Sequence, residues 1–151
     1  MTDADRAQDV VELLQGQHDL VRQLLRTIDE ASGADRSGPF TELLHQLEAH
    51  EVAEESVVYP ALRTLGSEAA AVADQRIAEE KEAEKAIADL QTKNSATDEF
   101  AQAFKKFRDA VEKHASAEES QVFPLLSSDF AADMRRELGS SLLRAEAQHS
   151  A

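Results

Sequence analysis

The chain has 151 residues, which is the size of one ordinary domain. Its 30 acidic and 16 basic residues give a formal net charge of −14. This charge argues against nucleic-acid binding, which needs a basic patch, and against polybasic attachment to anionic membranes. The lack of cysteine excludes disulfides, iron–sulfur clusters and a thiol nucleophile. Few Gly and Pro residues among many Ala, Glu and Leu predict an all-α protein.

The N-terminal residues are acidic, and no apolar stretch reaches the length of a membrane span. We therefore expect a soluble cytoplasmic protein. Its acidic surface predicts a monomer or a weak dimer.

Apolar residues recur at spacings of three and four, which is the period of amphipathic helices. The first predicted helix is followed by the loop SGADRSGP, and Pro39 then suits the first turn of the second. Pro60 is expected to stop or kink that second helix. We expect the first three helices at about Ala4–Ala31, Pro39–Pro60 and Glu68–Lys93. The fourth begins at Thr97 or Asp98, either of which can cap it, and is closed by Pro124 and Ser127–Ser128.

Helices of about 25 residues are about 37 Å long, and short loops between them favour an up-down-up-down four-helix bundle. The whole chain, 1–151, is predicted to be a single domain, with the bundle at about 4–126. A shorter helix at about 130–147 is expected either to pack over one end of the bundle or to mediate a dimer contact.

An internal repeat marks the centre of this bundle. The segments HEVAEESVVYPAL, from His50, and HASAEESQVFPLL, from His114, are identical at eight of thirteen positions. The first and third helices align similarly if His18 is placed opposite Glu80, because their apolar positions then coincide. Glu80 is thus predicted to hold in the third helix the place that His18 holds in the first.

The repeat places polar groups on the apolar stripes of the helices. Residues four apart lie above one another on a helix, so His50 pairs with Glu54 and His114 pairs with Glu118. Buried imidazoles and carboxylates are costly unless they are paired or bind a metal. A pair of metal ions at the bundle centre would satisfy all of them. The predicted ligands are His18, His50, Glu54, Glu80, His114 and Glu118.

Imidazole and carboxylate ligands suit iron, manganese or zinc. We favour iron, because a third carboxylate supports a ferric pair with an oxo or hydroxo bridge. Glu54 and Glu118 are the candidate bridging ligands. The alternative for the two His–Glu pairs is a buried hydrogen-bonded contact without metal.

The motifs His50-x-x-x-Glu54 and His114-x-x-x-Glu118, with His18 and the EESxV(Y/F)P continuation, resemble those of the hemerythrin-like HHE cation-binding domain. This resemblance extends over nearly the whole chain. It implies a four-helix bundle with an oxo-bridged non-haem di-iron centre, so two iron ions are the expected cofactor. It also implies ligand roles for both His–Glu pairs and for His18.

The family usually has a histidine in the third helix, where this chain has EEKEAEK. Glu80 is the expected substitute, with Glu84 and then Glu79 as alternatives. An anionic ligand stabilises Fe(III) and disfavours reversible oxygen carriage. We therefore expect an enzyme that disproportionates H₂O₂ in a catalase-like reaction, with Glu80 or Glu84 moving protons. The alternative is a non-catalytic module that binds O₂ or NO, or senses redox state or iron.

Several other residues are open to two interpretations. Tyr59 is expected to be a packing aromatic, with a redox-active or iron-ligating phenol as the catalytic alternative. We expect His45 to be exposed and His149 to lie in a disordered tail. Four further glutamates are expected to be surface charges and not ligands: Glu51, Glu55, Glu112 and Glu119.

Overall fold

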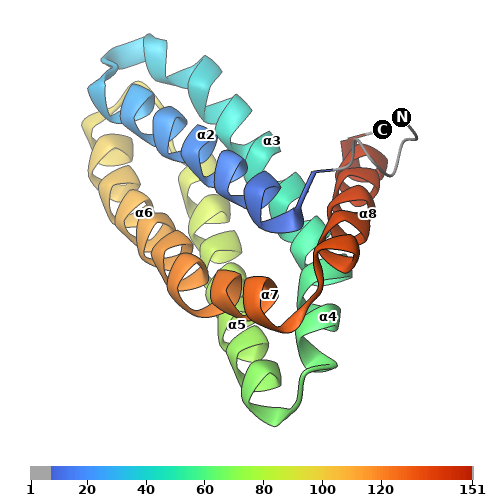
Figure 1. Ribbon diagram of the computed structural model, residues 1–151. Coiled ribbons are helices and arrows are strands. Elements are labelled where there is room, and N and C mark those ends of the chain that lie inside the picture. Colours follow the sequence, from blue (N-terminus) through green and yellow to red (C-terminus); the bar gives the residue numbers. More distant parts are fainter. Residues whose placement is uncertain (1–7, 151) are drawn as a thin grey trace.

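A computed structural model describes residues 8–150 of the chain, which are almost entirely helical. The four long helices are α2 (Val10–Glu30), α3 (Ser37–Ala53), α5 (Ser67–Gln91) and α6 (Asp98–Ala117). They lie side by side with their connections at alternate ends (Figure 1), and α2 packs against both α3 and α6. This is the predicted all-α, up-down-up-down bundle.

The helix ends follow local capping chemistry. The Asp9 carboxylate accepts a hydrogen bond from the Val11 N–H at 2.8 Å and so begins α2 at Val10. The predicted start near Ala4 lies outside the described residues. Thr97 caps α6, since its hydroxyl accepts from the Phe100 N–H at 3.2 Å. Of the two predicted caps, Thr97 is therefore the one used.

Neither proline stops helical structure, although a stop or kink is expected at Pro60, and after Pro124 the helix ends at Asp129, next to the predicted Ser127–Ser128. The chain passes from α3 through a π-helical turn, η2 (Glu54–Val58), into α4 (Tyr59–Arg63). After α6, it passes likewise through η3 (Glu118–Val122) into α7 (Phe123–Asp129). A proline ring clashes with the carbonyl four residues earlier in an α-helix. The wider π turn falls where that carbonyl lies, so helical structure continues beyond each proline.

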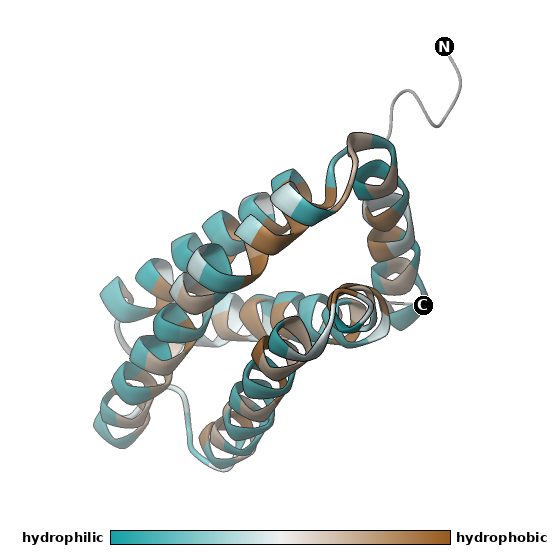
Figure 2. Ribbon diagram, turned by 60° about the horizontal axis from the view of Figure 1, so that its bottom comes forward, coloured by the Kyte–Doolittle hydropathy of each residue, from teal (hydrophilic) through white to brown (hydrophobic). Residues whose placement is uncertain are grey.

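Two apolar clusters make up the core, one towards each end of the bundle. In Figure 2 the hydrophobic side of the helices faces the interior. One cluster contains the aromatic contact between Phe40 and Phe100, whose ring centroids are 5.0 Å apart. The other contains Leu14, Tyr59 and Leu142. Between these clusters lies a buried polar layer, which holds the residues singled out in the sequence.

The C-terminal helix α8 (Ala132–Ser150) lies within two or three residues of its predicted bounds, and it packs against α2, α3 and η2. Leu142 on α8 is fully buried in the core. A β-carbon at Gly139 would lie 2.1 Å from the Gln8 carbonyl oxygen, so only glycine permits this close approach. Of the two roles predicted for this helix, the structure shows packing against the bundle, and a dimer contact stays a prediction. His149 belongs to α8 and does not lie in a disordered tail.

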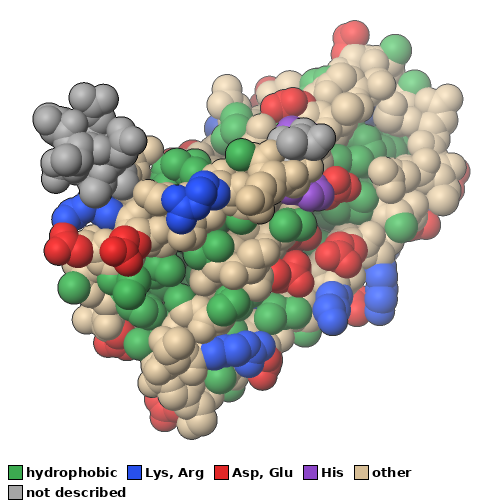
Figure 3. Space-filling model, turned by 90° about the vertical axis from the view of Figure 1, so that its right-hand side faces the viewer, with side chains coloured by type: hydrophobic (Ala, Val, Ile, Leu, Met, Phe, Trp, Pro, Cys, Tyr) green, Lys and Arg blue, Asp and Glu red, His purple; other side chains and the backbone are tan. Residues whose placement is uncertain are grey.

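On the face drawn in Figure 3, basic side chains stand among acidic ones and do not form a continuous patch. Among the described residues, no helix combines the length and apolar character needed to cross a membrane.

Candidate metal centre

Each His–Glu pair lies where a long helix passes into its π turn. His50 is in the last turn of α3 and Glu54 opens η2, with Nε2 and Oε1 3.0 Å apart. His114 and Glu118 repeat this arrangement at the end of α6, with a separation of 2.9 Å. The internal repeat of the sequence is thus a repeat of geometry.

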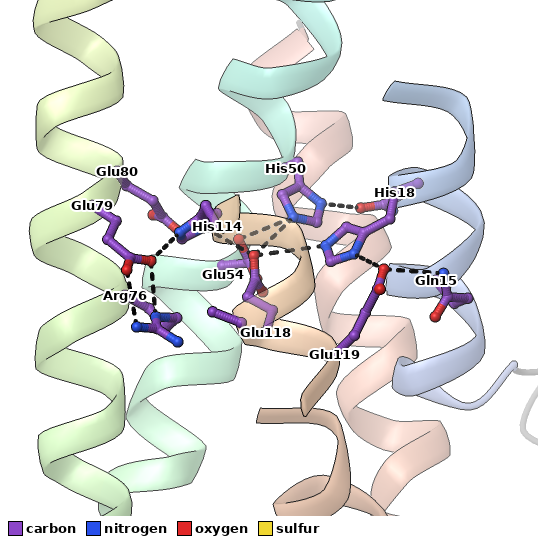
Figure 4. A network of polar contacts seen from close by, with 12 residues as sticks. Gln15, His18, His50, Glu54, Arg76, Glu79, Glu80, His114, Glu118 and Glu119 are labelled. Carbon is purple, nitrogen blue, oxygen red and sulfur yellow. Dashed lines mark hydrogen bonds and ion pairs between the residues drawn. The ribbon is translucent and has the colours of Figure 1, made fainter. Parts of the chain in front are cut away.

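The other two predicted ligands reach the same layer from α2 and α5. The His18 Nε2 lies 3.6 Å from the Glu118 Oε1. The Glu80 Oε2 lies 3.3 Å from the His114 Nε2. The structure therefore brings all six predicted residues together, as Figure 4 shows for their side chains. Five of them are buried, and His114 is partly accessible.

These side chains form two groups, each with ligand atoms close enough to surround one ion. The first group is His18, His50 and Glu118, and the second is Glu54, Glu80, His114 and Glu118. Glu118 belongs to both groups, which is the position of a bridging carboxylate. Glu54 also faces both groups, since it lies beside His50.

Unpartnered atoms provide a test of whether a metal fits. Five carboxylate oxygens, two on Glu54, two on Glu118 and one on Glu80, are buried without a hydrogen-bond partner among the described residues, and so is the His114 Nε2. Leaving such atoms buried and unsatisfied costs about 1–3 kcal/mol each, and more for charged groups. Imidazole nitrogens with carboxylate oxygens are ligands for divalent first-row metals. The donor set therefore fits a metal centre.

Strong electrostatic coupling acts among these side chains. Burial and the neighbouring Glu118 raise the pKa of Glu54 well above its usual range. Burial alone would lower the pKa of His114, but the close carboxylates of Glu118 and Glu80 outweigh burial and raise the pKa to about 11. Burial would also raise the pKa of Glu118, yet the adjacent Glu54 and histidines hold it well below its usual range. Protons thus occupy the positions that a cation would take, so metal binding must release them.

In two of the histidines, the Nδ1 atom contacts a carboxylate, and each of these carboxylates is paired with an arginine. The His18 Nδ1 lies 2.8 Å from Glu119, and Arg22 donates to both oxygens of that carboxylate. Glu119 is therefore not the simple surface charge that we predicted. Such outer partners fix the orientation of a ligand histidine and leave its other nitrogen free for a metal.

Glu79 plays the same part for His114. Its Oε1 lies 2.7 Å from the His114 Nδ1, and Arg76 pairs with this carboxylate at 2.9 Å. Glu79 is the second alternative to Glu80 as the predicted metal ligand of the third helix. The structure instead places it beside the His114 Nδ1, on the side of the ring away from the predicted metal site. Glu84, the first alternative, is exposed. Glu80 is thus the only one of the three whose carboxylate lies in the polar layer.

Glu51 does not fit its prediction as a surface charge. It is 7 % exposed, and burial raises the pKa of its carboxyl to about 8. Glu55 and Glu112 are exposed, as predicted, and so is His45. The apolar stripe of the second helix includes His50, and the next residue on a helix points away from that stripe. The sequence pattern therefore gave no indication that Glu51 is buried.

Tyr59 is both a packing aromatic and a neighbour of a predicted ligand. Its hydroxyl donates to the Glu80 Oε2 at 2.5 Å. Its repeat equivalent, Phe123, instead stacks against the His18 ring, with centroids 5.3 Å apart. The contact between Tyr59 and Glu80 could have been found in the sequence. Where one contact joins a phenylalanine and a histidine, the equivalent contact joins a tyrosine and a glutamate.

A cavity of about 390 Å³ reaches the polar layer between α5 and α6. Small apolar side chains line much of it, among them Ala83, Ala86, Ala110 and Val111, and polar side chains such as Gln75, Glu82 and Lys113 also contribute. The three histidines and Glu118 contribute to its lining. The cavity therefore offers small molecules a route to the predicted ligands.

Fold and site together define a helical-bundle protein with a buried cation-binding centre. The chain matches the model of the hemerythrin HHE cation-binding domain over residues 9–138 and belongs to this family. The fold is similar to a crystal structure of a hemerythrin HHE cation-binding domain-containing protein from Mycobacterium kansasii, with a TM-score of 0.82 and 26% sequence identity. That match covers 94% of this chain and 87% of the other. A search of curated proteins found no match.

Proposed function

We propose that this chain binds two iron ions and disproportionates hydrogen peroxide in a catalase-like reaction, in which two H₂O₂ give two H₂O and one O₂. The six converging side chains would hold the metals, with Glu118 and Glu54 between them. Bound iron would polarise peroxide as a Lewis acid and exchange electrons with it. The contribution of the protein side chains is to hold the metals in place and to transfer protons.

The observation that carries this proposal is the buried carboxylate of Glu80. It stands beside His114, where the repeat would otherwise put a second imidazole. An anionic ligand favours the higher oxidation state of iron, so reversible oxygen carriage is disfavoured and redox turnover is favoured. Glu80 is also the residue that we expect to accept and return a proton, through its unpartnered Oε1.

Tyr59 keeps Glu80 in position. Burial and the nearby carboxylates raise the pKa of Tyr59, so its phenol stays protonated and donates to the Glu80 Oε2. The same Oε2 lies 3.3 Å from the His114 Nε2, and the Oε1 has no hydrogen-bond partner among the described residues. Tyr59 is therefore proposed to set which oxygen of Glu80 takes part.

The test begins with the iron content of protein purified from iron-replete cells, and continues with oxygen evolution from H₂O₂ at an oxygen electrode. We expect about two irons per chain and steady evolution that persists when a chelator removes free iron. A chain that contains two irons but evolves no oxygen would contradict the proposed catalase-like activity.

A matched pair of variants separates Glu80 from the charge of its helix. Glu80→Gln should slow oxygen evolution at least about tenfold, as expected for loss of a group that transfers protons. Glu84→Gln removes the same charge from the exposed side of α5, one turn later, and should leave the rate unchanged. Equal rates in the two variants would remove Glu80 from the reaction.

The largely apolar walls of the cavity favour a second candidate, a module that binds O₂ or NO without turnover, or senses redox state or iron. Neutral diatomic molecules enter such a cavity without losing hydrogen bonds to water. Reversible changes in the visible spectrum on adding and removing O₂, without peroxide consumption, would favour this candidate.

A further inference from the structure

His50 is held differently from the other two histidines. Its Nδ1 lies 2.7 Å from the Oε1 of Gln17 on α2, and the Gln17 Nε2 donates to Glu146 on α8 at 2.9 Å. The chain of contacts therefore runs from the C-terminal helix through α2 to the polar layer. Glu146 lies beyond residues 9–138, the part of the chain that the family model matches.

An amide such as Gln17 can present either its oxygen or its nitrogen to a histidine, so by itself it does not fix the imidazole tautomer. An ionised carboxylate only accepts hydrogen bonds. Glu146 therefore turns the NH₂ group of Gln17 towards α8 and its oxygen towards His50. The Nδ1 of His50 must then carry the proton.

We propose that Glu146 is a positioning residue for the metal centre: acting through Gln17, it fixes the His50 tautomer in which Nε2 is free to bind a metal. This inference rests on metal binding by His50 but not on any reaction of the metal. It makes α8 part of the site.

The packing of α8 holds Glu146 at the required place. Leu142, one turn before Glu146 on the same face, is fully buried in the core. Gly139 lets the helix approach the Gln8 backbone, and Arg135 pairs with Asp9 at the start of α2. These contacts fix the position of α8 along α2, and Gln17 lies on that same helix.

The test uses the zinc-loaded full-length chain, because zinc accepts the same ligands and is diamagnetic. The first measurement is the rate at which a chelator removes zinc. Loss of such an outer partner typically weakens metal binding 10–100-fold, so we expect at least about tenfold faster removal in Glu146→Ala. Glu137→Ala is the matched control, since Glu137 is an exposed glutamate on the same helix.

The double variant distinguishes positioning from a general loosening of α8. If Glu146 acts through Gln17, Gln17→Ala combined with Glu146→Ala should release zinc no faster than Gln17→Ala alone. The His50 Nδ1–H proton should also give a slowly exchanging NMR signal in the zinc-loaded chain and in Glu137→Ala, but not in Glu146→Ala.

Zinc removal that is equally fast in Glu146→Ala and Glu137→Ala overturns the proposal, and so do additive effects of the two substitutions or a parent chain that binds no zinc. Failure of the proposed function looks different: a chain that shows the coupling with zinc but evolves no oxygen with iron keeps the positioning role and loses the catalase-like reaction.

Discussion

The two halves of this molecule share one plan, and within the polar layer they differ at two linked positions. Each half ends a long helix with a His–Glu pair, a π turn and a proline. The first half supplies His18 and a tyrosine, whereas the second supplies Glu80 and a phenylalanine. The phenol of Tyr59 reaches across to Glu80, and the ring of Phe123 reaches across to His18. A predicted ligand and the aromatic residue that contacts it therefore change together between the two halves.

This exchange gives the two groups of candidate ligands different numbers of carboxylates. One group of candidate ligands holds two imidazoles and one carboxylate, and the other holds one imidazole and three carboxylates. Carboxylate oxygen is a harder ligand than imidazole nitrogen. We therefore expect the ion near Glu80 to be held in a more oxidised state than its neighbour.

The largest effect, on iron content, is expected from substitution of Glu118, where the two halves meet. Glu118 belongs to both ligand groups, so Glu118→Ala should lose both ions and reduce the iron content from about two per chain to nearly none. Elemental analysis of the purified variant measures this. Glu119→Ala, at the next position, removes only the outer partner of His18 and should keep most of the iron. Equal iron content in the two variants would contradict a bridging position for Glu118.

The second substitution makes the halves alike. Glu80→His restores a neutral ligand opposite His18, so the iron should become easier to reduce and peroxide turnover should fall at least about tenfold. Redox titration and the oxygen electrode measure these changes. The same substitution at exposed Glu84 is the control and should alter neither. If Glu80→His raises peroxide turnover, the anionic ligand does not drive the reaction.

A smaller effect should follow from exchanging the aromatics. Tyr59→Phe leaves the Glu80 Oε2 without its donor in a buried place, and a hydrogen bond to a charged group is worth about 1.5–3 kcal/mol. We expect the metal-free chain to lose about 2 kcal/mol in free energy of unfolding, measured with urea.

The mirror substitution Phe123→Tyr puts a hydroxyl near His18 and should cost a similar amount unless a partner is found. A metal-free Tyr59→Phe chain as stable as the parent would show that the contact with Glu80 contributes nothing.

A separate effect concerns the pH dependence of the free energy of unfolding. The raised pKa of His114 means that the folded metal-free chain holds a proton that the unfolded chain loses near pH 6.5. The contribution to stability is complete below pH 6.5 and is lost as pH rises towards 11. Urea unfolding between pH 6 and 10 should show this decline, and His114→Gln should flatten it. A stability that rises over this range would contradict the assignment.

Much of this architecture could be predicted from the sequence because hydrophobic periodicity and the internal repeat are both local signals. The repeat alone placed Glu80 opposite His18, although the third helix has few large apolar side chains. The π turns could not be foreseen in the same way, because proline indicates where an α-helix is disturbed but not how the backbone adapts. The outer partners Gln17, Glu79 and Glu119 depend on contacts between different helices, which periodicity does not encode.

The polar layer between the two apolar clusters has a consequence for how the molecule unfolds. Without metal, this layer contains buried carboxylate oxygens that lack hydrogen-bond partners within the described part of the chain, so it stabilises the bundle less than the apolar clusters on either side of it. Ions shared by all four long helices would make them one cooperative unit. Hydrogen exchange should accordingly be uneven along each helix in the chelated protein and uniformly slow once metal is bound.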